Sequence, residues 1–264
     1  MSSVELRSPL KTRPLRFPGQ SVQADIERDV YEGVLPYFMA TLLLTVLAAL
    51  EWVLALRHAP RQPWTYTVIA LLAGIAFVWR LLRVRTRVTQ LKLGRDGERV
   101  VGQFLEGLRV SGARVFHDIQ ADGFNLDHVV LSTHGFYVIE TKTRLKPIRG
   151  EARVTLADEG VLVAGYRPDR DPIVQVRGAA DWLAKTLEES TGKRFAIRGV
   201  VVFPGWWVEP MSVEWKRSPN KPWVLEPKAL PGFIEHEPQA VAPSDVSMAA
   251  YHLSRYIRAV EAEA

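Results

Sequence analysis

The sequence predicts an α/β protein in which a mixed β-sheet flanked by helices follows a two-helix transmembrane hairpin. Residues 90–264 alternate short β-branched and aromatic runs with amphipathic helical periods, which is typical of such a sheet. Two long apolar runs precede them, and about 20 helical residues rise about 30 Å, the thickness of a hydrocarbon core. The 264 residues include no cysteine, which excludes disulfides, thiolate metal sites and a cysteine nucleophile.

The apolar runs occupy residues 37–56 and 64–82, and the short proline-containing segment RHAPRQP separates them. Their only charged residues are Glu51 and Arg80, and tryptophans lie toward the ends of the runs, as at membrane interfaces. A buried helical hairpin in a soluble core is the alternative. We favour membrane insertion because two adjacent runs of spanning length are uncommon in a soluble domain.

Positive charge is concentrated in the first third of the chain. Residues 1–89 hold 11 Lys and Arg against 6 Asp and Glu, whereas residues 90–264 hold 23 of each. Basic residues cluster just after the second apolar run, while the loop between the runs has only Arg57 and Arg61. The positive-inside rule therefore predicts a multi-pass protein of the plasma (inner) membrane, with both termini and the globular domain in the cytoplasm.

These patterns divide the chain into five parts. A short amphipathic helix is expected at residues 21–32 of the first part. The parts are an N-terminal cytoplasmic arm (1–36), the transmembrane hairpin (37–82), a basic juxtamembrane linker (83–93), the globular domain (94–205), and a Trp-rich loop with a C-terminal helical extension (206–264).

Within the globular part, apolar spacing and turn residues define the elements. Asp171 is the expected N-cap of one helix and Gly192 its end, and Ser244 is the expected cap of the last helix. The elements in order are a helix opening at 94–97, strands at 113–117, 126–131 and 136–142, a hairpin at 152–156 and 161–164, a helix at 172–189, a strand at 197–203 and the last helix.

The stretch LDHVVLSTHGFYVIETK carries the candidate chemistry. If residues 132–135 form the turn, Asp127 faces Glu140, and Lys142 shares a sheet face with both carboxylates. Opposed Cβ atoms lie about 4.5–5.5 Å apart, so the carboxylates converge within reach of one small cation, and their oxygens suit Mg²⁺ or Mn²⁺. The alternative is a structural ion pair with Lys142, and a one-residue register shift would separate the carboxylates.

The segments GRDGERVVGQFLEGL, VFHDI and NLDHVVLSTHGFYVIETKTR resemble the NERD (nuclease-related) domain of the PD-(D/E)xK restriction-endonuclease-like superfamily. The resemblance covers roughly residues 91–203 and implies a restriction-endonuclease-like fold acting on nucleic acid, DNA in preference to RNA. It implies that Asp127, Glu140 and the Thr141 carbonyl bind the metal and that Lys142 is catalytic. The resemblance also implies that Glu98 and Gln175 complete the site. Without it, Glu98 would be read as a charge that stabilises a helix N-terminus, and Gln175 as an ordinary surface residue.

Two further patches are candidates for binding substrate. Arg144, Lys146 and Arg149 follow the acidic pair and would hold flanking phosphates, or else form a solvated basic loop. The segment 204–223 interleaves four tryptophans with Lys and Arg, which fits base stacking, a membrane interface, or packing as a lid on the core. The histidines at 117, 128 and 134 lack the spacing of a zinc site.

The sequence therefore predicts a membrane-anchored nuclease-like enzyme that hydrolyses phosphodiester bonds with Mg²⁺ or Mn²⁺ by activating water. The competing hypothesis is a catalytically silent, membrane-tethered module that binds nucleic acid or a protein. The neutral charge of residues 90–264 favours this second hypothesis, because a general nucleic-acid binder is more basic.

Overall fold

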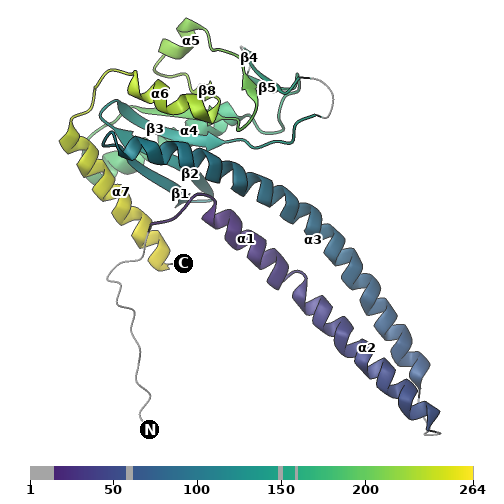
Figure 1. The fold of residues 1–264 in the computed structure, drawn as a ribbon. Coiled ribbons are helices and arrows are strands. Elements are labelled where there is room, and N and C mark those ends of the chain that lie inside the picture. The colour runs from purple at the N-terminus through teal and green to yellow at the C-terminus, as the bar shows by residue number, and fades with distance from the viewer. Residues whose placement is uncertain (1–14, 58–61, 148–150, 158–159, 264) are drawn as a thin grey trace, which may run out of the picture. The chain divides into compact units, whose positions relative to one another are not determined.

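The predicted architecture, a mixed sheet flanked by helices and preceded by two long apolar helices, is confirmed (Figure 1). The computed structural model describes residues 15–57, 62–147, 151–157 and 160–263. The chain divides into two compact units. Ser21–Arg95 form the helical unit, and Met1–Gln20 together with Asp96–Ala264 form the globular unit.

The helical unit contains antiparallel helices, as a hairpin requires. Trp52 of one helix donates its indole N–H to Thr67 Oγ1 of the next at 2.9 Å, and the rings of Phe38 and Phe77 lie 5.8 Å apart. The elements are α1 (Gln20–Tyr31), which matches the predicted amphipathic helix, α2 (Leu35–Leu56), and the first part of α3 (Pro63–Glu106).

Helix α3 is longer than the sequence predicted. The expected linker at 83–93 is helical, and the expected helix start at 94–97 lies inside α3. No proline follows Pro63 within the helix, and Gly94 and Gly97 each cost only about 1 kcal/mol relative to alanine. The second apolar run and the first helix of the globular domain are therefore one continuous helix.

The main sheet has five strands in the order β1-β2-β3-β6-β8. The first three strands are antiparallel neighbours, whereas β6 and β8 run parallel to β3 and β6. The predicted turn between β2 and β3 is confirmed, since Ser132 pairs with Gly135 and His128 with Ile139. The strands are β1 (Arg114–Ala121), β2 (Phe124–Ser132), β3 (Gly135–Thr141), β6 (Ile197–Val202) and β8 (Trp223–Leu225).

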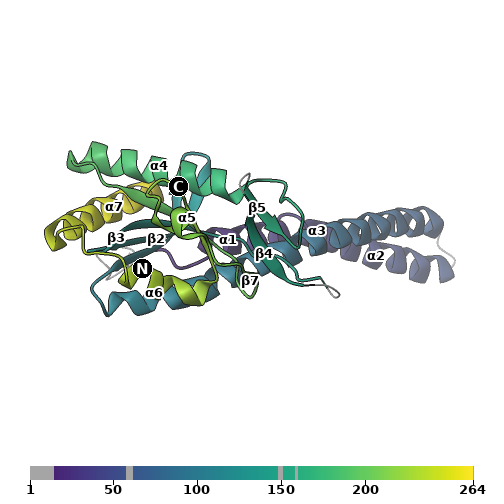
Figure 2. The ribbon, with the colours of Figure 1, turned by 90° about the horizontal axis from the view of Figure 1, so that it is seen from above.

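Helices cover both faces of this sheet (Figure 2). On one face Leu183 of α4 (Pro172–Thr191) and Leu253 of α7 (Pro243–Glu263) share a buried core with Val138. On the other face the C-terminal end of α3 and α6 (Leu230–Glu235) cover Ile139 and its neighbours. The short helices η1 (Gly107–Arg109), α5 (Val213–Arg217) and η2 (Pro227–Ala229) lie in the connections.

The predicted ends of α4 are confirmed, but the predicted start of α7 is wrong. The Asp171 carboxylate accepts the Ile173 N–H at 2.8 Å, and Gly192 ends α4 with φ +71°. Helix α7 begins at Pro243, so Ser244 lies in its first turn and does not cap it. Proline is favoured at the first helical position because its missing N–H needs no partner there.

A second, three-stranded sheet has the order β5-β4-β7, with β4 (Arg153–Ala157), β5 (Gly160–Val163) and β7 (Trp207–Val208). The predicted hairpin forms β4 and β5, while β7 comes from the Trp-rich segment. In that segment Trp206 and Trp223 are buried, Trp215 is half-buried, and Trp207 is exposed. Two of the four tryptophans, Trp206 and Trp223, therefore pack in the core.

Candidate functional site

Helix α3 approaches the end of β3 closely at Gly97. A Cβ atom at this position would overlap the Thr143 side chain, so only glycine permits the approach. The next residue, Glu98, is half-buried and receives a backbone hydrogen bond from Gly19. The glycine of the motif thus brings Glu98 to the end of the sheet that also carries the predicted acidic pair.

Asp127 and Glu140 lie where β2 and β3 cease to pair, one residue beyond the pair His128 and Ile139. Asp127 Oδ2 accepts the Thr141 N–H at 2.7 Å, which turns the carboxylate toward the end of β3. Lys142 Nζ donates to Glu140 Oε1 at 2.6 Å. We call Glu98, Asp127 and Glu140 the acid cluster.

The three carboxylates of the acid cluster repel one another. Burial raises the pKa of Glu98 to about 8, with further contributions from the charges of Asp118 and Glu140. Burial also raises the pKa of Asp127, assisted by Glu140 and then by Glu98. Lys142 opposes both shifts. Such a group of mutually repelling carboxylates is typical of functional sites and is stabilised by a cation.

Asp118 is a residue at this site that the sequence did not predict. It is 2% exposed and adopts φ +51°, a left-handed conformation that costs an L-residue of order 1–3 kcal/mol. Arg16 donates two hydrogen bonds to Asp118 Oδ2, at 2.6 and 2.9 Å. The only signal in the sequence was a charged residue inside the apolar run VFHDI, and nothing there pointed to a partner at residue 16.

A pocket of about 300 Å³ opens beside Lys142. Gln175 of α4 lines it, and the Gln175 side-chain oxygen is buried without a hydrogen-bond partner. Arg144 lines the same pocket, Lys146 is exposed two residues further on, and Arg149 lies outside the described residues. The structure therefore brings Gln175 and Arg144 to Lys142, as the predicted site requires.

The donors at this site fit a hard divalent cation. Asp127 and Glu140 offer carboxylate oxygens, which are ligands that Mg²⁺ and Mn²⁺ prefer, and Asp127 is bonded to the backbone of Thr141, whose carbonyl is the predicted third ligand. The side-chain oxygens of Gln175 and Thr141 are buried and lack a partner. Among the described residues, no three His, Asp or Glu side chains are grouped to hold a metal. A cation here would therefore need carbonyl or water oxygens besides the carboxylates.

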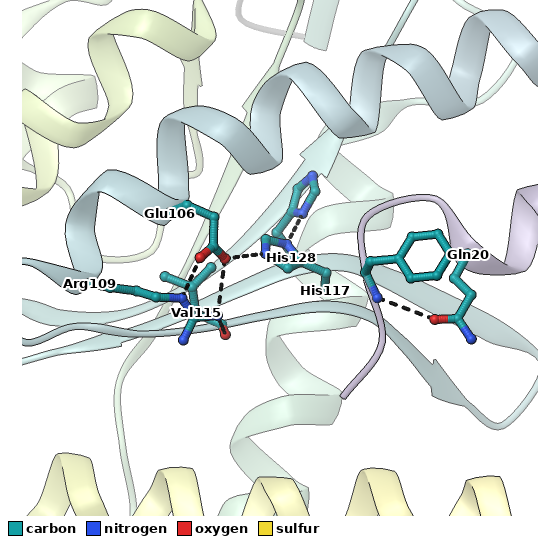
Figure 3. Close-up of polar contacts among 7 residues, drawn as sticks. Gln20, Glu106, Arg109, Val115, His117 and His128 are labelled. Carbon is teal, nitrogen blue, oxygen red and sulfur yellow. Dashed lines mark hydrogen bonds and ion pairs between the residues drawn. The ribbon is translucent and has the colours of Figure 1, made fainter. Parts of the chain in front are cut away.

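A separate polar chain runs from the end of α3 into the sheet (Figure 3). Arg109 donates to both Glu106 oxygens, Glu106 Oε1 lies 2.8 Å from His117 Nε2, and the Nδ1 atoms of His117 and His128 lie 2.8 Å apart. Burial lowers the pKa of both histidines, in His128 aided by His117. The two rings share one proton in their contact, so a doubly protonated pair is disfavoured.

This histidine pair predicts a loss of stability in mild acid. Unfolded histidines have a pKa near 6.5, and both folded values are lower, so below about pH 6.5 the unfolded chain binds more protons. The contribution of the two histidines to the free energy of unfolding should therefore fall from pH 7.5 to pH 5.5, whereas the raised pKa values of Glu98 and Asp127 give a contribution of the opposite sign. Thermal unfolding followed by tryptophan fluorescence tests this. Between pH 7.5 and pH 5.5, His128→Gln should gain stability relative to the unchanged protein, because it lacks the contribution of this histidine; an equal pH dependence of the two proteins would contradict the assignment.

The comparison with protein families agrees with the resemblance read from the motifs. The sequence model of the nuclease-related domain, NERD, matches residues 93–204. No curated protein sequence matches the chain. The structure of Pyrococcus furiosus SfsA in complex with Ca²⁺ matches with a TM-score of 0.22 and 16% sequence identity, covering 65% of this chain and 54% of that one, so the chain spans about half of SfsA.

The nuclease-related resemblance is thus confirmed for residues 93–204, which include every residue of the acid cluster and Lys142. The match ends before the Trp-rich segment and begins after the two apolar runs. Residues 93–204 therefore match a nuclease-related domain, and two long apolar helical stretches lie in the part of the chain that includes and precedes its start.

Proposed function

We propose that the chain is a metal-dependent nuclease that hydrolyses phosphodiester bonds in nucleic acid at the cytoplasmic face of the inner membrane. The acid cluster is in contact with Lys142, which lines a pocket together with Arg144 and Gln175, and this arrangement is the observation that carries the proposal. The match of residues 93–204 to a nuclease-related domain supports the same reaction class. The PD-(D/E)xK assignment gives these residues their roles.

In this proposal Asp127, Glu140 and the Thr141 carbonyl would hold Mg²⁺ or Mn²⁺. A bound divalent ion polarises a phosphate oxygen and lowers the pKa of a bound water. Lys142 Nζ lies 2.6 Å from Glu140 Oε1. From this position it would orient the attacking water or neutralise the charge that develops on the phosphate. The unpartnered Gln175 oxygen accepts a hydrogen bond from that water or from the substrate.

Glu98 has a distinct part in the site. With a pKa of about 8, it carries a proton at neutral pH when no cation is present. A nearby cation favours the ionised carboxylate, because it offsets the repulsion from Glu140. Glu98 would therefore lose its proton when a cation binds, and its ionised carboxylate would then be available to accept a hydrogen bond from a bound water.

Membrane anchoring is the second part of the proposal. The helical stretches Gln20–Leu56 and Pro63–Arg109 are long and apolar enough to cross a bilayer by length and composition. In each stretch only 6% of the apolar 18-residue segment is buried inside the protein, whereas a core helix of a soluble protein is mostly buried. The full chain should stay with the membrane during alkaline carbonate extraction. Release without detergent would contradict anchoring and favour a soluble hairpin.

The nuclease proposal is tested on the full chain in detergent with labelled DNA and RNA. We expect cleavage with Mg²⁺ or Mn²⁺, none with EDTA, and recovery when the metal is restored. Lys142→Ala should abolish cleavage, while Lys185→Ala on the exposed face of α4 should not. Cleavage that persists in EDTA, or equally in Lys142→Ala, would contradict the proposal.

A membrane-tethered binding module without catalytic activity is the second candidate. The direct Glu140–Lys142 ion pair favours it, because this contact already neutralises one carboxylate of the acid cluster. The balanced charge of residues 90–264 favours it as well. This candidate predicts that the chain binds no divalent cation at Glu140.

A further inference from the structure

We infer that the segment of residues 16–19, which precedes the two apolar helices, is part of the candidate site, where Arg16 and Gly19 act as positioning residues for Glu98. The inference rests on the proposed function, because it explains how one member of the acid cluster is held in place. It goes beyond that function, since residues 16–19 lie outside the matched nuclease-related domain of residues 93–204. The contacts of this segment with α3 and β1 carry the inference.

A tight turn gives this segment a defined shape. The Gln20 N–H donates to the Phe17 carbonyl at 3.2 Å, and the Phe17 N–H donates to Gln20 Oε1 at 3.3 Å (Gln20 is drawn in Figure 3). Pro18 and Gly19 occupy the two central positions, and Gly19 has φ +70°. Proline is common at the first of these positions, and glycine adopts a positive φ at the second without steric cost. The sequence FPGQ therefore fixes the backbone that carries the Gly19 N–H.

One face of α3 meets this turn. Glu98 and Gly102 are four residues apart, so they lie on the same side of the helix. Gly19 is buried and donates its backbone N–H to Glu98. A Cβ atom on Gly102 would lie only 2.4 Å from Pro18 Cγ, so only glycine permits the contact there. The turn therefore packs directly on the helix that carries Glu98, over about one helical turn.

Arg16 attaches the same segment to β1. Its Nη2 atom lies 2.6 Å from Asp118 Oδ2, and the two side chains are 10% and 2% exposed. His117, the neighbour of Asp118 on β1, has its Cε1 atom 3.5 Å from the same Cβ position on Gly102. The segment, helix α3 and strand β1 therefore meet around Gly102, and a buried ion pair holds the three together.

The segment also acts on the charge of Glu98. Burial raises the pKa of Glu98 most, the charge of Asp118 raises it further, and the hydrogen bond from Gly19 lowers it. Arg16 offsets the Asp118 charge and holds the turn that carries Gly19. Loss of Arg16 therefore removes both a restraint on the position of Glu98 and the charge that offsets its repulsion from Asp118.

Amide hydrogen exchange of the metal-free full chain in detergent, followed by mass spectrometry, tests these contacts. We expect Arg16→Ala and Glu98→Ala each to speed exchange of the Gly19 amide about tenfold, because each removes a bond that holds it. The matched control is Lys193→Ala, which breaks the ion pair with Asp245 at 2.6 Å and should leave this amide unchanged. Unchanged exchange at Gly19 in either Arg16→Ala or Glu98→Ala would overturn the inference.

Cleavage under single-turnover conditions tests the positioning role. Arg16→Ala should lower the rate constant about 10–100-fold at unchanged affinity for nucleic acid, the usual cost of losing a partner that orients a residue of a metal site. Because Arg16→Ala also removes a buried charge partner, the double variant Arg16→Ala/Asp118→Asn is compared with it at a temperature where tryptophan fluorescence shows both folded. The double variant restores the charge balance but not the attachment of the turn, so it should stay slow and keep fast exchange at Gly19. Lys193→Ala should stay within about twofold of the unchanged rate.

Cleavage by the double variant at the rate of the unchanged protein would also overturn the inference, because Arg16 would then serve charge balance alone. The exchange experiment contains neither metal nor substrate, so its outcome is separate from that of the cleavage assay. A chain whose Gly19 amide responds as expected, but which cleaves nothing with Mg²⁺ or Mn²⁺, would retain the positioning of Glu98 by residues 16–19 and lose only the nuclease function.

Discussion

Glu140→Gln is expected to lower metal-dependent cleavage about a thousandfold, the upper range for removing one preorganised electrostatic contact from an active site. Glutamine keeps the shape of the side chain but removes its negative charge. The change removes a ligand of the proposed cation and the ion pair with Lys142 Nζ at 2.6 Å. The rate constant for cleavage of a labelled oligonucleotide under single-turnover conditions measures the effect.

The control for this variant is Glu189→Gln, which removes an equivalent charge from an exposed pair with Lys185 on α4. That change should leave the rate within about twofold, since exposed ion pairs are worth little. Asp127→Asn should behave like Glu140→Gln. If the cleavage rate fell less than about tenfold in both Glu140→Gln and Asp127→Asn, with substrate still bound, the assignment of the acid cluster as the site of hydrolysis would be contradicted.

Arg16→Ala is expected to lower the free energy of unfolding by about 3 kcal/mol, the cost of breaking a buried ion pair by removing one partner. Arg16 and Asp118 are buried to 10% and 2% side-chain exposure, and their shortest contact is 2.6 Å. Without Arg16, the buried Asp118 carboxylate loses both guanidinium hydrogen bonds. Urea unfolding followed by tryptophan fluorescence measures the change.

The double variant Arg16→Ala/Asp118→Asn separates loss of charge balance from loss of packing. It should recover a large part of the lost stability, because the neutral amide no longer needs a cation. Lys193→Ala, which breaks the more exposed pair with Asp245, should cost less than about 1 kcal/mol. No recovery in the double variant would show that Arg16 acts through its packing instead.

Elements with a local signal could be predicted from the sequence. Residues 132–135 alone predict the turn between β2 and β3, and Asp171 and Gly192 predict the two ends of α4. The continuity of α3 was missed because glycines at 94 and 97 suggested a new start, whereas the helix passes through both. Strand β8 was missed because the three residues from Trp223 form a strand only by pairing with β6.

The residues of the candidate site likewise divide into those that a local sequence pattern could place and those that it could not. Asp127, Glu140 and Lys142 lie close together in sequence, so strand alternation and one turn could place them. The Arg16–Asp118 pair joins residues 102 positions apart, and no local pattern predicts such a partner. The contact between His117 and His128 depends on the β1–β2 register, in which these two residues are opposed. Spacing rules for metal sites overlook it.

Isothermal titration of the metal-free full chain with MnCl₂ measures whether a divalent cation binds at the acid cluster. We expect binding at one site, tighter as the pH rises toward about 8 because Glu98 must lose its proton, and lost in Glu140→Gln but kept in Glu189→Gln. Absence of binding in the unchanged chain, or equal binding in Glu140→Gln, would contradict the proposed cation site.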